Sequence, residues 1–216
     1  WSRVAWASLG RRWPGFADPS RWHIARGTDA IAPACGECRA ALALRDSLRH
    51  RGDIEQAYLE LIAAAQTEVV IANAYFFPGR RFRRALRAAA VRGVRVVLLL
   101  QGRVEYTLLH YASRALYRRL LEAGVEIHEY SRSFLHAKVA VFDARVATVG
   151  SSNIDPFSFL LAKEANVFVD DAPFAGQLRA SLGEAMQTGA RRVRLHRWRR
   201  LSWWLRLRIR LAYATA

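Results

Sequence analysis

Residues 136–153 read HAKVAVFDARVATVGSSN, and the interpretation of the whole chain begins with this stretch. His136 and Lys138 are two residues apart, so on an extended strand their side chains share one face. A Gly-Ser-Ser-Asn turn follows a second apolar run, residues 146–149. An imidazole, an ammonium, a hydroxyl and a carboxamide are therefore expected together at the ends of two adjacent strands. Such a set suits a phosphodiester, because it combines a nucleophile or proton donor with fixed donors for the phosphoryl oxygens.

Lysine is rare in this chain. Of its 34 basic residues, only Lys138 and Lys163 are lysine. Because arginine supplies positive charge everywhere else, a lysine beside His136 indicates that a compact ammonium is required there. A surface His and Lys on a half-buried strand would explain a lone His-x-Lys, but not the whole string with its Gly-Ser-x-Asn turn.

The spacing HxKxxxxDxxxxxxGSxN resembles the signature of the phospholipase D superfamily, the HKD motif. Glu164 lies downstream in KEANVFV, where that family places a carboxylate against the catalytic histidine. Two upstream segments, IANAYFFPG at 71–79 and GVRVVLLLQG at 93–102, are similar to the bacterial cardiolipin synthase branch. The similarity covers about residues 38–190.

This resemblance implies transfer of a phosphatidyl group through a phosphohistidine, with no metal or other cofactor. Enzymes of this kind carry two HKD motifs that face across a shared site, whereas this chain has one. The chain is therefore expected to be the second half of a longer cardiolipin synthase. In two-motif members the first-half histidine tends to be the nucleophile, which would make His136 the general acid and base. A single motif leaves that assignment open.

The resemblance also implies roles for the other polar residues of the motif. Lys138, Ser151 and Asn153 would bind phosphoryl oxygens. Glu164 would hold the tautomer of the imidazole and raise its pKa. Asp143 belongs to the expected catalytic group, although a structural role in orienting the turn or Lys138 is favoured over proton transfer.

Three residues that end expected strands, Tyr75, Gln101 and Tyr130, are further candidates. In α/β sheets, sites form where strands end and loops begin. They could support the catalytic residues or contact a headgroup, although ordinary strand-end residues would look the same.

Composition narrows the choice of partner. The net charge is +16 and the sequence pI is about 11.2, which points to nucleic acid or an anionic membrane. Cys35 and Cys38 form a lone Cys-x-x-Cys without further ligands nearby, so neither a zinc site nor a redox site is expected. No run of 18 uncharged apolar residues occurs. The expected location is peripheral, on the cytoplasmic side of a bacterial inner membrane.

Strand and helix patterns alternate from residue 39 to residue 190, which predicts an α/β fold: one mixed β-sheet sandwiched by helices, as in a phospholipase D-like half-domain. Residues 1–38 are expected to be a connector from a preceding domain, and residues 191–216 a basic amphipathic tail. Asp53 is expected to cap the first helix, and Gly93 and Gly124 to end the next two. The expected strands are 40–44, 68–75, 94–100, 125–130, 135–142, 146–149 and 165–169, and the expected helices are 53–65, 81–92, 106–123 and 172–186.

The tail has a second distinctive pattern over residues 191–211. A helix there would gather an apolar stripe on one side and arginines on the other, as in a helix that lies on anionic lipid. The same face could instead pack on a partner half, and residues 205–211 also alternate as a strand would. The stripe consists of Trp198, Leu201, Trp204, Leu205 and Ile209, and the opposite face of Arg199, Arg206 and Arg210.

The expected function is thus the formation of cardiolipin from anionic phospholipids at a membrane surface. A homodimeric nuclease or phosphodiesterase is the alternative, because one motif per chain then suffices and the positive charge would serve DNA. A third possibility is a non-catalytic half that only completes the site of a partner.

Overall fold

The computed structural model describes residues 38–45, 52–155, 163–199 and 203–215. Eight strands form one sheet in the order β1-β7-β6-β5-β2-β3-β4-β8. β2, β3 and β4 run parallel to one another, and the other neighbours are antiparallel. The strands are β1 (Arg39–Arg45), β2 (Glu68–Asn73), β3 (Arg95–Gln101), β4 (Glu126–Tyr130), β5 (Lys138–Phe142), β6 (Val146–Gly150), β7 (Glu164–Asp170) and β8 (Ala190–Val193).

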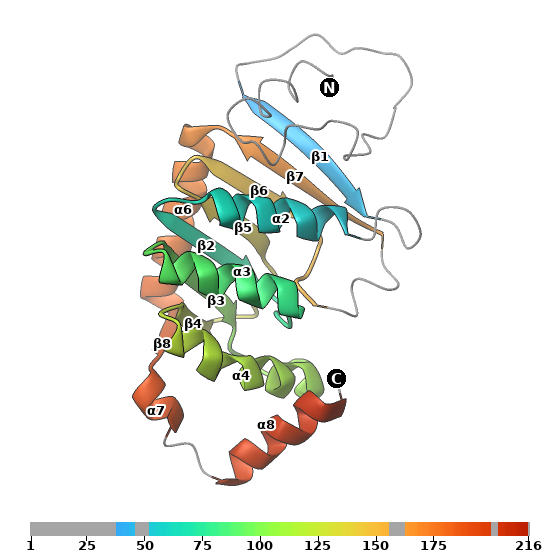
Figure 1. The fold of residues 1–216 in the computed structure, drawn as a ribbon, viewed down its shortest axis with the longest axis vertical. Coiled ribbons are helices and arrows are strands. Elements are labelled where there is room, and N and C mark those ends of the chain that lie inside the picture. Colours follow the sequence, from blue (N-terminus) through green and yellow to red (C-terminus); the bar gives the residue numbers. More distant parts are fainter. Residues whose placement is uncertain (1–37, 46–51, 156–162, 200–202, 216) are drawn as a thin grey trace.

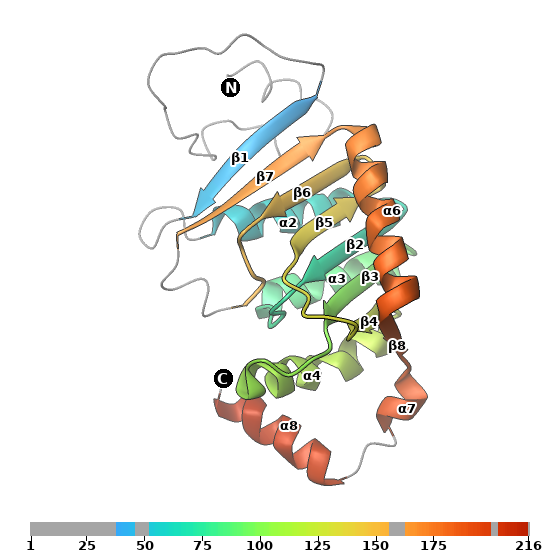
Figure 2. The same cartoon turned by 180° about the vertical axis from the view of Figure 1, so that it is seen from behind.

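Helices cover both faces of this sheet (Figures 1 and 2). Three helices lie on one face, α2 (Asp53–Ala64), α3 (Arg80–Val91) and α4 (Thr107–Glu122), and α6 (Ala172–Gly189) lies on the other. Side chains of β2 alternate between the two cores: Val69 and Ile71 face α2 and α3, whereas Val70 and Ala72 face α6. Residues 96–101 of β3 are all buried, as expected for a strand covered on both faces. The predicted α/β fold with a mixed sheet is confirmed.

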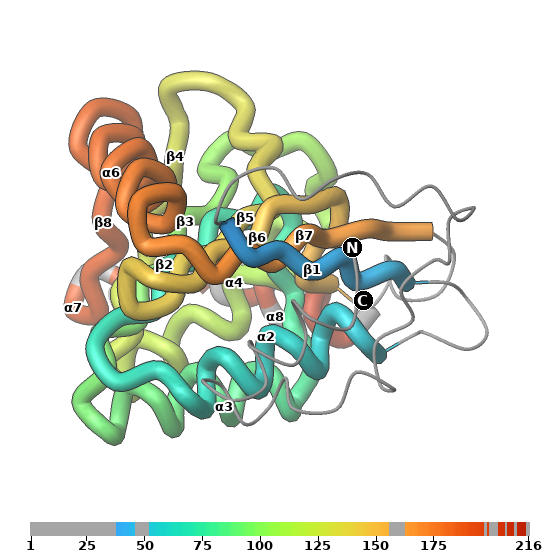
Figure 3. The backbone as a smooth tube through the Cα atoms, turned by 90° about the horizontal axis from the view of Figure 1, so that it is seen from above, coloured from blue at the N-terminus to red at the C-terminus, as the bar shows by residue number. Residues whose placement is uncertain are grey.

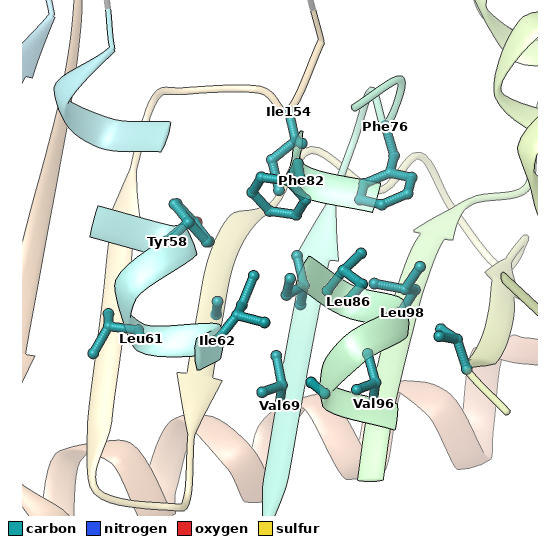
Figure 4. Close-up of a cluster of buried hydrophobic side chains, with 14 of the residues drawn as sticks. Tyr58, Leu61, Ile62, Val69, Phe76, Phe82, Leu86, Val96, Leu98 and Ile154 are labelled. Atoms are coloured by element: carbon teal, nitrogen blue, oxygen red, sulfur yellow. The ribbon is translucent and has the colours of Figure 1, made fainter. Parts of the chain in front are cut away.

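The larger core extends towards the end of the sheet where the HKD motif begins. Figure 4 shows α2 and α3 side chains packed over β2 and β3, with Phe76 and Ile154 at one end of the cluster. Ile154 directly follows the Gly-Ser-Ser-Asn turn and forms an isolated β-bridge with Phe76. The Phe77 N–H donates to the Ile154 carbonyl at 2.7 Å. The turn is therefore tied to the hydrophobic core.

Helix ends follow local sequence signals, with one correction. Gly93 and Gly124 lie just beyond α3 and α4 with φ of 92° and 91°, as predicted for helix-ending glycines. The predicted cap of α2 is wrong, because Gly52 occupies the N-cap position and Asp53 is the first helical residue. Asp53 instead places an acidic side chain in the first turn, where its negative charge interacts favourably with the positive end of the helix dipole.

The C-terminal segment differs from the predicted single helix. Residues 191–193, expected in the tail, belong to β8, which pairs antiparallel with β4. Two helices follow, α7 (Leu195–Arg199) and α8 (Trp203–Thr215), and α8 packs against α4 (Figure 2). Seen from above, α8 lies on the side of the sheet that carries α2 and α3 (Figure 3). No helix among the described residues has the length and apolar character needed to cross a bilayer.

Three expectations fall wholly or partly on residues that the structure does not describe. The connector predicted for residues 1–38 is covered only at Cys38, and Cys35 lies outside the described residues. Cys38 itself is exposed and carries a free thiol. Leu201 and the side chains of Arg199, Arg206 and Arg210 also lie outside the described part of the chain.

Candidate active site

Strand directions bring the residues of the motif to one edge of the sheet. β5 runs antiparallel to both β2 and β6, and β7 runs antiparallel to β6. The starts of β5 and β7 therefore lie at the same edge as the ends of β2, β3 and β6. His136 and Lys138 stand at the start of β5, the Gly-Ser-Ser-Asn turn follows β6, and Glu164 begins β7.

His136 and Lys138 are in direct contact. The Nζ atom of Lys138 lies 2.8 Å from Nε2 of His136, and it also donates to the His136 carbonyl at 3.3 Å. An ammonium can only donate, so Nε2 accepts in this contact and the neutral ring carries its proton on Nδ1. His136 precedes β5 rather than lying within it, and its side chain is exposed at the sheet edge. Its ring is accessible to a substrate while Lys138 holds it.

Lys138 is buried, with 7% of its surface exposed. Burial lowers the pKa of its ammonium, and the carboxylates of Glu164 and Glu105 counteract this effect. Lys138 pairs across the sheet with Asn73, which is fully buried at the end of β2. A compact buried cation thus lies directly beside the imidazole, and two carboxylates favour its charged form.

The Gly-Ser-Ser-Asn turn is packed against β7. A Cβ at Gly150 would lie 2.3 Å from the Asn166 side chain, so only glycine fits at this position. The hydroxyl of Ser151 donates to Glu164 and accepts from the Ala165 N–H at 3.1 Å. Asn153 is half-buried, and its Oδ1 atom has no hydrogen-bond partner among the described residues. A group that pairs with this buried oxygen has to donate a hydrogen bond to it.

Three buried polar residues that the sequence analysis did not identify support this turn. Asn166 accepts from the Ser152 N–H at 3.3 Å and donates to Thr148 at 3.2 Å. Asn73 accepts from the Ile154 N–H at 3.2 Å. Arg45, whose side chain is only 1% exposed, donates to the Ser152 hydroxyl at 3.3 Å. Asn73 and Asn166 lie within segments that carry the family resemblance, whereas nothing local distinguishes Arg45 among the many arginines.

The position of Glu164 differs from the predicted contact with His136. Its carboxylate accepts from Ser151 and lies 3.8 Å from the Arg45 guanidinium. Among the described residues it forms no hydrogen bond with the imidazole. Glu164 therefore fixes the Ser151 hydroxyl in this structure, and Lys138 is the group that contacts the His136 ring.

Asp143 is not brought together with the other motif residues. It lies at the opposite end of β5, in the turn that leads to β6, with φ of 50°. Its carboxylate accepts from the N–H groups of Gln66, Thr67 and Glu68 at 2.8–2.9 Å. Burial would raise the pKa of this carboxyl, but these backbone donors hold it below its usual value. Asp143 thus anchors a turn, which is the structural role favoured from the sequence.

The three strand-end candidates have different surroundings. Gln101 accepts from the Leu135 N–H at 3.2 Å, so it holds the residue that precedes His136. The hydroxyl of Tyr75 donates to Glu105 at 2.5 Å. Tyr130 packs against Gly189, where a Cβ would lie 2.3 Å from its ring, so its role is structural. Among the described residues, no three His, Cys, Asp or Glu side chains cluster as metal ligands.

Comparison with known proteins places this site in a family. The model of a family described as "Cardiolipin synthase, PLD-like domain" matches residues 58–186. Cardiolipin synthase B of Shigella flexneri is 44% identical over 191 residues, which are 88% of this chain and 46% of that protein. The chain therefore spans about half the length of the curated relatives it matches.

Two solved structures share the fold. The phospholipase D family member Nuc of Salmonella typhimurium superposes with a TM-score of 0.61 at 21% identity, covering 73% of this chain and 99% of Nuc. The phosphatidylserine synthase of Haemophilus influenzae gives a TM-score of 0.58 at 15% identity, with 72% and 39% coverage. The spacing of the motif, the sheet edge that assembles it and these similarities agree: the chain belongs to the family of phospholipase D-like domains of cardiolipin synthases.

Proposed function

We propose that this chain supplies one of two HKD motifs in an enzyme that forms cardiolipin from two phospholipids, such as two phosphatidylglycerols. The observation that carries the proposal is the 2.8 Å contact between His136 and the buried ammonium of Lys138 at an open sheet edge. The 44% identity to a protein named cardiolipin synthase B supports the choice of substrate.

In the first step, the nucleophilic histidine of one motif attacks the phosphorus of the donor. A nitrogen–phosphorus bond forms, the bond from phosphorus to the glycerol headgroup breaks, and the other histidine gives its proton to the leaving alkoxide. In the second step, that histidine takes a proton from a hydroxyl of the acceptor. The acceptor oxygen attacks phosphorus, the nitrogen–phosphorus bond breaks, and both histidines regain their starting states.

Within this chain we assign His136 to one of the two histidines. We assign Lys138, through its ammonium, and Asn153, through its NH₂ group, as donors for the phosphoryl oxygens, because both residues lie at the same edge as His136. The hydroxyl of Ser151 must turn away from Glu164 to join them. Lys138 must likewise move from Nε2 to a phosphoryl oxygen when substrate binds.

We further propose that α8 binds an anionic membrane. Ile209 and Ala212 are buried on the side of α8 that packs against the domain, and Tyr213 contacts Phe77. The other side exposes Trp203 and Trp204, each 61% exposed and stacked on one another, together with Leu207 and Leu211 at helical spacing. Tryptophan beside arginine is typical of a helix at the headgroup level of a bilayer.

The apolar stripe predicted from the sequence is therefore divided. Trp198 on α7 packs against Tyr117 of α4, with ring centroids 5.1 Å apart, and Ile209 is buried against the domain. Trp204 remains exposed. The proposed location is peripheral, at the cytoplasmic surface of a bacterial inner membrane.

A substrate comparison tests the proposed function. The catalytically complete enzyme, with both motifs present, should convert phosphatidylglycerol into cardiolipin and glycerol in equal amounts and leave DNA uncut. Cleavage of DNA without cardiolipin formation would favour the phosphodiesterase, for which the net charge of +16 is the supporting observation.

Dilution of the purified chain distinguishes a site completed by a different polypeptide from a site formed by two copies of this chain. Residues 1–216 alone should be inactive and should gain activity when a polypeptide with the second motif is added. Activity that falls with the square of concentration would instead show that two copies of this chain form the site.

A further inference from the structure

A narrow pocket of about 30 Å³ lies beside the catalytic edge, between the ends of β2 and β3 and the start of α4. Its walls form hydrogen bonds with the residues directly before and after His136. Ala74 lines the pocket and donates its N–H to the carbonyl of Ala137, at 2.9 Å. Gln101 lines it too and accepts from the N–H of Leu135. The pocket and the motif are therefore held in a fixed relation.

One polar group of this pocket lacks a partner. The side chain of Gln101 is 8% exposed, and its Nε2 atom is buried without a hydrogen-bond partner among the described residues. A buried donor left unpaired is costly, so a group that accepts a hydrogen bond is expected to meet it. Glu105, also in the wall, is bound by the Tyr75 hydroxyl and keeps further lone pairs that can accept.

The chemistry of the pocket walls selects one kind of group. A volume of about 30 Å³ exceeds the roughly 10–15 Å³ that one water needs, so the pocket has room for a small polar group. The group must accept from the Gln101 amide and donate to the Glu105 carboxylate. A hydroxyl does both, whereas an ammonium only donates and a carboxylate only accepts.

We propose that this pocket binds the hydroxyl adjacent to the reacting hydroxyl of the acceptor, so that the enzyme selects acceptors with a 1,2-diol. The inference rests on the proposed function, because the acceptor is an alcohol only if the enzyme transfers a phosphatidyl group. A glycerol headgroup carries such a pair, with a primary hydroxyl next to a secondary one. Gln101 and Glu105 hold the second hydroxyl while the first approaches the phosphorus.

Competing soluble alcohols test this selectivity in the catalytically complete enzyme with phosphatidylglycerol as donor. The acceptors are 1,2-propanediol, 1,3-propanediol and 1-propanol. Their phosphatidyl products all differ in mass from phosphatidylglycerol, and the two diol products, which are isomers, can be separated from one another. Wild type should favour 1,2-propanediol over both others. Glu105→Gln should lower transfer to 1,2-propanediol about tenfold more than transfer to 1-propanol, because one charge-assisted hydrogen bond is lost.

A second variant addresses the hydrogen-bond donor of the pocket, which is the Gln101 amide. Gln101→Glu keeps an oxygen for the Leu135 N–H but removes the amide donor, so it should also lose the preference for the 1,2-diol. Glu184→Gln, on the exposed side of α6, is the matched control and should keep the wild-type ratio.

The possible failures are distinguishable. Equal wild-type transfer to all three alcohols, or an equal loss with all three in Glu105→Gln, would overturn the role of the pocket and leave the proposed function intact. An enzyme that forms neither cardiolipin nor any phosphatidyl alcohol would overturn the proposed function, and the role of the pocket with it.

Discussion

At the scale of single residues, we predict that the site depends on a lysine that an arginine cannot replace. The Lys138 ammonium is buried and lies 2.8 Å from Nε2 of His136. A guanidinium is larger and planar, so in this space it would displace the imidazole rather than donate to it. The rarity of lysine in the sequence and the enclosure of Lys138 in the structure lead to the same expectation.

Lys138→Arg should therefore lower phosphatidyl transfer by on the order of 100-fold, nearly as much as Lys138→Ala. The matched control is Lys163→Arg, at an exposed position outside the motif, which should behave like wild type. Rates of cardiolipin formation by the complete enzyme measure both. Wild-type activity in Lys138→Arg would show that charge alone matters at this position.

A half-buried histidine that lines the pocket beside the site makes stability depend on pH. Burial, with a smaller effect of Arg114, lowers the pKa of His110 to about 4, whereas an unfolded histidine titrates near 6.5. The folded state thus binds fewer protons than the unfolded state between these values, so stability falls as the pH drops from 6.5 towards 4. Urea unfolding at pH 7 and pH 5 should show a smaller loss in His110→Gln than in wild type. An equal loss in both would contradict the assignment.

At the scale of secondary-structure elements, Asp143 anchors the turn between β5 and β6, and we predict that it takes no part in the chemistry. The Asp143 carboxylate binds the backbone that leads into β2, far along the strand from His136. Asp143→Asn keeps the side-chain shape and tolerates the positive φ, but its NH₂ group would face backbone donors. It should lower the free energy of unfolding by about 1–3 kcal/mol.

The activity of Asp143→Asn per folded molecule should remain close to that of wild type. Urea unfolding and transfer rates, measured on the same preparation, separate the two effects. A loss of activity at unchanged stability would place Asp143 in the chemistry after all.

The outer face of α8 provides a prediction about membrane binding. Trp203→Ala combined with Trp204→Ala should reduce binding to anionic vesicles, because two exposed aromatic side chains leave the interface. Binding should also weaken in salt, since each basic residue near an anionic surface contributes about 1 kcal/mol. Phe174→Ala, a partly exposed aromatic on α6, is the control. Equal flotation with neutral and anionic vesicles would leave only packing as the role of α8.

Elements with strong local signals were predictable, and those created by tertiary contacts were not. β3 was evident because its apolar run is continuous, and α3 and α4 because glycines follow them. β8 has the sequence ARRV, with no strand pattern, and exists because it pairs with β4. The division of the tail into α7 and α8 follows from how each packs on α4, which periodicity does not encode.

The same distinction holds in the site. The spacing of His136 and Lys138 predicted their proximity, because two residues on one chain segment cannot separate far. The partners of Glu164 were not predictable, because Ser151 and Arg45 come near its carboxylate only when the chain is folded. Arg45 comes from a strand more than 100 residues away from Ser152, so nothing local indicated it.

At the scale of the whole molecule, the sheet brings the starts of β5 and β7 and the ends of β2, β3 and β6 to one edge and leaves His136 exposed there. In-line displacement at phosphorus requires a nucleophile on one side and a proton donor on the other, so one imidazole cannot serve both. An exposed His136 on a chain that spans about half the length of its relatives fits the proposed two-motif site.

The most direct measurement of this account is cardiolipin formation by the complete enzyme with His136→Ala. Loss of a nucleophile or proton-transfer group should reduce the rate at least about 100-fold, while thermal unfolding stays close to that of wild type because the side chain is exposed. A folded His136→Ala enzyme that forms cardiolipin within a few-fold of the wild-type rate would contradict the central claim.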